Sequence, residues 1–97
     1  MPTYISLLRF TQKGIEQIKQ SPTRLDATKK LFRDAGAELK AFYLTTGRTD
    51  ALTIFDAPSD EVVARLRLTL AAHGYIRTET FRAFTEAEYR KIIAALS

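Results

Sequence analysis

A chain of 97 residues, 45% hydrophobic and 27% charged, has the length and composition of one globular domain. This composition excludes a disordered chain, and no apolar run approaches the roughly 18 residues that a membrane-spanning helix needs. The N-terminus carries neither the basic segment nor the cleavage site of a signal peptide, so we expect a cytoplasmic protein.

The net charge of +4 is concentrated in the first half of the chain. Residues 1–48 hold nine bases and four acids, whereas residues 49–97 hold six bases and seven acids. No run of bases exceeds two residues, which favours a solvated helix face over a nucleic-acid site. Weak nucleic-acid binding through the basic half is therefore the least favoured functional hypothesis.

Strands alternate with helical segments along the chain. Residues 3–10 are aromatic, aliphatic and β-branched, which predicts a strand. Thr11 can cap a short helix. Ser21 as N-cap and Pro22 at the first helical position predict the start of a longer helix, which Gly36 ends.

Two further strands are predicted at 37–45 and 50–56. They are joined by a hairpin loop in which Gly47 is free to adopt a positive φ. Ser59 is the expected cap of the next helix, and Gly74 ends that helix.

The fourth strand is predicted at 75–84, and the last helix begins at the most specific local signal in the chain. Thr85 and Glu88 match a capping box, flanked by Phe84 at a hydrophobic-staple position. The apolar spacing predicts that this helix buries one face, formed by Tyr89, Ile92, Ile93 and Leu96.

The predicted order is β-α-β-β-α-β-α, an α+β class. Right-handed crossovers and one hairpin turn this order into a ferredoxin-like βαββαβ sandwich with a C-terminal helix. The strand order is then 4-1-3-2, all antiparallel, with the helices on one face of the sheet.

Both faces of the predicted sheet are apolar. Ile5 and Leu7 share one face of the first strand, while Leu39, Ala41 and Tyr43 share one face of the second. Two crossover helices cover only one face, and the other would expose more apolar area than monomers usually show. We expect a second copy to pack there, sheet against sheet; the alternative is that the C-terminal helix folds over the open face.

Several polar residues have both a functional and a structural interpretation. Asp50 either closes the hairpin or serves as a proton acceptor, and His73 either ends a helix or serves as a metal ligand or base. Tyr4 and Tyr43 either supply hydroxyls on the open face or pack at an interface. With Arg48 and Arg77, the residues Tyr4, Tyr43 and Asp50 make up the candidate ligand-binding set.

Charged residues of the strands offer one further candidate. Arg77 and Glu79 share a face of the fourth strand, where they either pair with each other or, with Arg9 and Lys40, line an anion site.

Cofactor chemistry is not expected. The chain has no Cys and one His, too few for a zinc site, and it contains no glycine-rich dinucleotide motif. It also has no Asn and no Trp, so the chemistry of cofactor-independent monooxygenases and haem-degrading enzymes is not supported. We expect no metal, haem, flavin or nicotinamide.

A resemblance to a known family is carried by residues 3–7, 10–15, 18–22, 40–45, 47–50 and 76–80. Together these segments resemble the GYD domain family across nearly the whole chain. The family's Gly-x-Tyr-Asp signature is matched by Gly47 and Asp50, but Thr49 replaces the tyrosine. The resemblance implies a small bacterial or archaeal dimeric α+β barrel protein, and it implies no particular function.

The leading functional hypothesis is a homodimer, or a higher even oligomer, that is non-enzymatic or binds a small organic ligand in a pocket beside the sheet. The alternative is a cofactor-independent enzyme of the dimeric α+β barrel type. It would act on a small aromatic or enolisable compound, with Asp50 or His73 as base.

Overall fold

The computed structural model describes residues 1–97, and every expected strand is present, with ends that differ by at most one residue. The elements are β1 (Thr3–Phe10), α1 (Gln12–Glu16), the 3₁₀ helix η1 (Ile18–Gln20), α2 (Ser21–Asp34), β2 (Glu38–Leu44), β3 (Ala51–Asp56), α3 (Asp60–His73), β4 (Ile76–Ala83) and α4 (Glu86–Ala94).

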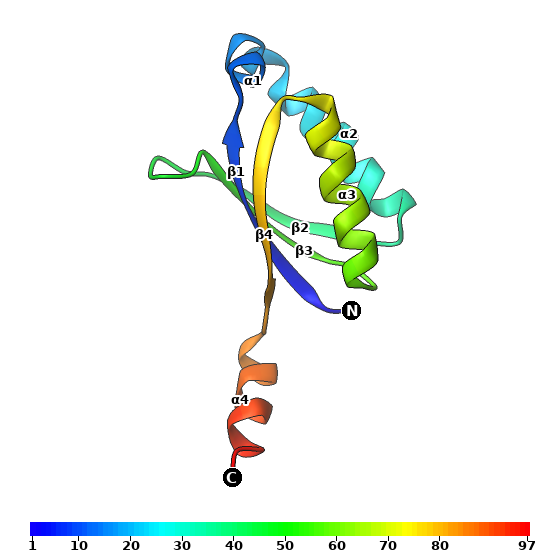
Figure 1. Cartoon of the computed structure of the whole chain (residues 1–97), viewed down its shortest axis with the longest axis vertical. Helices are drawn as coiled ribbons and strands as arrows, with labels where there is room; N and C mark the ends of the chain where they lie inside the picture. The colour runs from blue at the N-terminus through cyan, green and yellow to red at the C-terminus, as the bar shows by residue number, and fades with distance from the viewer.

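The four strands form one antiparallel sheet in the order β2-β3-β1-β4. In Figure 1, α2 and α3 lie beside each other on the same side of the sheet. The predicted α+β class, element order and strand order are therefore confirmed. None of the helices combines the length and apolar character that crossing a bilayer requires.

Burial alternates along the two central strands, as a sheet with one covered face requires. In β1, Tyr4, Ser6 and Leu8 are buried, whereas the residues between them are half-buried. Thr53 and Phe55 of β3 share the covered face. The core on this face is made of Tyr4, Phe32, Ala37, Phe55, Ala57, Val62 and Leu66.

A β-bulge in β2 changes the predicted faces of that strand. The register against β3 shifts between Leu39 and Ala41, so one extra residue is inserted there. Leu39 consequently lines the helix-covered face together with Phe42, while Ala41 and Tyr43 stay on the open face. The prediction that Leu39 shares a face with Ala41 and Tyr43 was wrong, because strict alternation cannot anticipate a bulge.

Three of the predicted helix starts are confirmed by side-chain caps. The hydroxyls of Thr11, Ser59 and Thr85 accept backbone N–H groups of their own helices. Thr85 and Glu88 form the complete capping box. Ser21 is not an N-cap: it is the first residue of α2, because η1 runs directly into that helix.

Two glycines end helices in the left-handed conformation, as predicted. Gly36 has a φ of 80° and Gly74 a φ of 83°. Gly47 does not adopt a positive φ, since the hairpin loop is longer than a tight turn and closes by a bond from the Thr45 N–H to the Asp50 carbonyl.

The C-terminal helix differs most from its prediction. In Figure 1, α4 projects below the rest of the chain, away from the sheet and from α2 and α3. None of its residues is buried, so the expected burial of its apolar face is wrong for the single chain. Nor does α4 cover the open face. Its projection contributes to a radius of gyration of 14.7 Å, above the about 13 Å typical of this length.

Candidate functional site

The uncovered side of the sheet carries a continuous apolar surface, which we call the open-face patch. Register places Ile5 beside Ile54 and Phe81, and Leu7 beside Leu52. Most of these side chains are half-buried by their neighbours in the sheet, whereas Tyr43 and Phe81 are 60% and 43% exposed. The open-face patch consists of Ile5, Leu7, Ala41, Tyr43, Leu52, Ile54 and Phe81.

A second apolar surface runs along α4 and is called the α4 stripe. It consists of Tyr89, Ile92, Ile93 and Leu96, which are between 44% and 66% exposed. The spacing of three and four residues places Tyr89, Ile92 and Ile93 on one side of α4, and Leu96 follows the end of the helix. This spacing is typical of amphipathic helices that insert into a groove of a partner protein.

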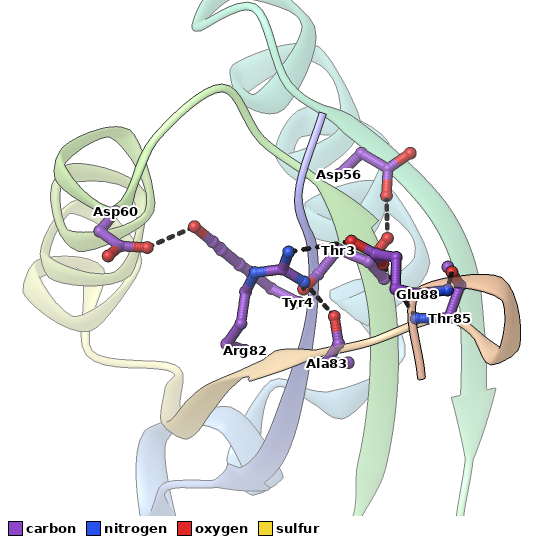
Figure 2. Close-up of polar contacts among 8 residues, drawn as sticks. All are labelled: Thr3, Tyr4, Asp56, Asp60, Arg82, Ala83, Thr85 and Glu88. Carbon is purple, nitrogen blue, oxygen red and sulfur yellow. Dashed lines mark hydrogen bonds and ion pairs between the residues drawn. The ribbon is translucent and has the colours of Figure 1, made fainter. Parts of the chain in front are cut away.

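Arg82 of β4 links α4 to the sheet through polar contacts. As Figure 2 shows, its guanidinium lies among β1, the end of β4 and α4. It donates to the carbonyl oxygens of Thr3, at 3.1 Å, and of Ala83. It also pairs with the Glu88 carboxylate at 3.2 Å. One half-buried arginine therefore fixes the direction in which the helix leaves the sheet.

Tyr4 and Asp60 link β1 to the start of α3. The Tyr4 ring is 2% exposed, and its hydroxyl donates to the Asp60 carboxylate (Figure 2). This hydrogen bond, together with burial, raises the pKa of Tyr4 above its ordinary value. Tyr4 lies on the covered face, so it does not supply a hydroxyl on the open face, which was one of the two roles considered for it.

The predicted ligand-binding residues do not converge. Tyr43 and Arg77 lie on open-face positions of β2 and β4, at opposite edges of the sheet, and Arg48 is exposed in the hairpin loop. The Asp50 carboxylate accepts the Phe10 N–H at 2.8 Å, a structural link between the hairpin and β1. Their role in ligand binding remains a prediction.

The remaining charged candidates are dispersed as well. Lys40 pairs with the Asp56 carboxylate at 3.0 Å rather than joining an anion site. Arg9 and Arg77 are neighbours in the register of β1 and β4, and neither they nor Glu79 forms an ion pair within the chain. His73 is exposed in the last turn of α3, as predicted.

A cavity of about 310 Å³ lies between the sheet and the helices α2 and α3. Its wall is mostly aliphatic and aromatic, and it includes Phe10, Leu25 and Phe42. Polar groups enter it from two sides: Ser6, Thr53 and Thr78 from the sheet, and Ser21, Arg24, Thr28, His73 and Tyr75 from α2 and the α3–β4 connection. Asp50 is not among its lining residues.

Sequence reasoning missed the residues at one side of this cavity. The Arg24 guanidinium lies 4.2 Å and the Lys13 ammonium 4.3 Å from the centre of the Tyr75 ring. Both distances are those of cation–π contacts. Lys13, Arg24 and Tyr75 lie in separate segments of the sequence, and no short motif links them. The fold brings them together where Gly14 lies close to Tyr75.

Two comparisons with known proteins gave a match. A Thermus thermophilus protein with the name "glutamine synthetase and cystathionine beta-lyase binding protein" is 34% identical over 89 residues. These residues cover 91% of this chain and 94% of the relative. No solved structure matches. The model of the GYD domain matches residues 4–93, which span all four strands and most of α4. The chain therefore belongs to the GYD domain family.

Proposed function

We propose that this chain is a self-associating, protein-binding regulator whose partner is a metabolic enzyme, with glutamine synthetase as the first candidate. One observation carries the proposal: the chain buries only 12 of its 97 residues and leaves two separate apolar surfaces, the open-face patch and the α4 stripe, in water. Exposed apolar surfaces of this extent are typical of protein–protein contacts. The name of the Thermus relative supports an enzyme as the partner.

The open-face patch is assigned to a second copy of the chain. It is a broad sheet surface, and two such sheets pack face to face at about 10 Å. A two-fold contact requires one surface to be complementary to itself. Arg77 and Glu79 lie beside the patch and have no ion-pair partner in their own chain. Arg77 of one copy is therefore available to pair with Glu79 of the other.

The α4 stripe is assigned to the partner enzyme. The helix stands away from the body of its own chain and presents apolar residues at the spacing of helix-in-groove anchors. The capping box fixes its first turn, and Arg82 fixes its direction through Glu88. A helix formed before binding loses less conformational entropy when it docks, which favours affinity.

The test is binding to purified glutamine synthetase from the same organism, measured by biolayer interferometry. Wild-type chain is expected to bind. Ile93→Gln is expected to weaken binding at least about tenfold, since it removes a central apolar anchor. Ala94→Gln is the matched control, because it introduces the same side chain on the opposite side of the exposed helix and should leave affinity nearly unchanged.

Three outcomes would contradict the assignment. The first is no binding of the wild-type chain at its highest soluble concentration. The second is equal loss in the Ile93→Gln and Ala94→Gln variants. The third is dissociation of the self-associated form by Ile93→Gln, because it would place the α4 stripe in the contact between copies instead of in the enzyme contact.

A further inference from the structure

The cavity between the sheet, α2 and α3 is separate from both protein-binding surfaces. Its wall belongs to the covered face of the sheet, and no residue of the open-face patch or of α4 lines it. The volume of about 310 Å³ falls at the lower end of the range of about 300–1,000 Å³ found for small-molecule sites. The packed core around Tyr4 and Leu66 lies beside it and does not fill it.

The side chains that line the cavity include a base but no acid. Arg24 and His73 line it, and Lys13 stands behind the Tyr75 ring. No Asp or Glu lines the cavity, and neither Arg24 nor Lys13 forms an ion pair with a carboxylate of the chain. The Arg24 guanidinium donates one hydrogen bond, at 3.0 Å, to the Gln17 carbonyl oxygen. Its other N–H groups are available to an anion.

Thr53 supplies a polar group at the floor of the cavity. It is only 6% exposed, at the centre of β3. Its hydroxyl takes part in none of the side-chain hydrogen bonds of the chain, unlike Ser6 beside it, which bonds to Thr80 at 2.7 Å. Every fully enclosed side-chain oxygen of the chain has a hydrogen-bond partner, so the Thr53 oxygen is not enclosed. Because Thr53 lines the cavity, its oxygen faces the cavity space. The hydroxyl is therefore open to the water or ligand that fills the cavity.

We propose that this cavity binds a small apolar carboxylic acid. The carboxylate lies at Arg24, the ring or branched chain lies among Leu8, Leu25 and Phe42, and the inner end approaches the Thr53 hydroxyl. Arginine suits this role because its planar donors match a carboxylate, and its stacking on Tyr75 holds the guanidinium at the edge of the cavity. The inference is independent of the enzyme partner.

The probes are sodium 4-phenylbutyrate and its neutral amide, 4-phenylbutanamide, titrated into the full chain and followed by ¹⁵N-edited NMR and calorimetry. One acid is expected to bind per chain, with amide shifts at Arg24, Thr53 and Tyr75. The neutral amide is expected to bind at least about tenfold more weakly, because it lacks the charge-assisted contact. Arg24→Gln should weaken the acid by about the same factor and leave the amide unchanged.

Arg33→Gln is the matched control, since Arg33 is exposed on the same helix and does not line the cavity. It should bind the acid as the wild type does. Equal affinity for the acid and the amide, or equal effects of Arg24→Gln and Arg33→Gln, would overturn the proposal. So would shifts confined to the open-face patch, or an absence of shifts with 4-phenylbutyrate, decanoate and indole-3-acetate alike.

Discussion

Arg82 of β4 and Glu88 of α4 lie 3.2 Å apart, and they form the one ion pair that joins the C-terminal helix to the sheet. The other three ion pairs lie within α2, within α4 and between β2 and β3. Glu88 also completes the capping box by accepting the Thr85 N–H at 3.0 Å. The position of an exposed helix therefore depends strongly on one carboxylate.

This dependence predicts that α4 responds to acid. The Thr85 N–H and then Arg82 hold the pKa of Glu88 below its ordinary value of 4.5. A depressed folded-state pKa means that the stabilisation is present above the ordinary value and is lost as the pH falls through the lower one. The Cα chemical shifts of α4 should therefore move toward coil values below about pH 4.

Two variants isolate the Glu88 effect. Glu88→Gln should lower the helicity of α4 at neutral pH and flatten its pH response. Glu86→Gln removes only the exposed pair with Arg90 and should keep the acid transition. Wild-type shifts that stay constant down to pH 2.5 would refute this account of the helix anchor.

Tyr4→Phe tests the link between β1 and α3. Removing the hydroxyl deprives Asp60 of its partner, which should lower the free energy of unfolding by about 1–2 kcal/mol at pH 7. Because the pKa of Tyr4 is raised above 10.0, its contribution is complete below that pH and is lost at higher pH. The two proteins should therefore converge in urea denaturation as the pH rises past that value. Tyr89→Phe, on an exposed ring, is the control, and an equal effect of both would count against the link.

Gly14→Ala tests the close approach of α1 to Tyr75 in the α3–β4 connection. A Cβ at this position would lie 2.2 Å from the Tyr75 carbonyl oxygen, which also accepts the Thr11 N–H. The backbone must move, so we expect a loss of about 1–3 kcal/mol in the free energy of unfolding. Gly47→Ala is the matched control, because nothing lies within 4 Å of its Cβ position and its φ is not positive. Equal denaturation midpoints for the two variants would contradict the close approach.

Local signals in the sequence predicted most of the fold. The cap at Thr85 and the stops at Gly36 and Gly74 depend on neighbouring residues, so they can be found in a short stretch of sequence. The strand order follows from the order of elements and from connection rules. These parts of the prediction needed no knowledge of long-range contacts.

Features that depend on distant packing were predicted less well. The apolar spacing of Ile92 and Ile93 indicates an amphipathic helix, but it cannot say whether the apolar side meets the same chain or another one. The bulge after Leu39 moved a side chain to the other face of the sheet. Arg24 and Tyr75 come from separate elements that only the tertiary structure brings together. A pocket beside the sheet was part of the leading hypothesis, but Arg24 and Tyr75 were not among its predicted residues.

The mass of the protein in solution tests the assignment of the open-face patch most directly. Light scattering at micromolar concentration should give twice the chain mass of 11.0 kDa, or a higher even multiple. Leu7→Asp, at the centre of the open-face patch, should shift the protein to a folded monomer, whereas Arg33→Asp on the exposed side of α2 should not. A wild-type chain that runs as a monomer, or a Leu7→Asp variant that keeps the wild-type mass, would contradict the assignment of the open-face patch to a second copy.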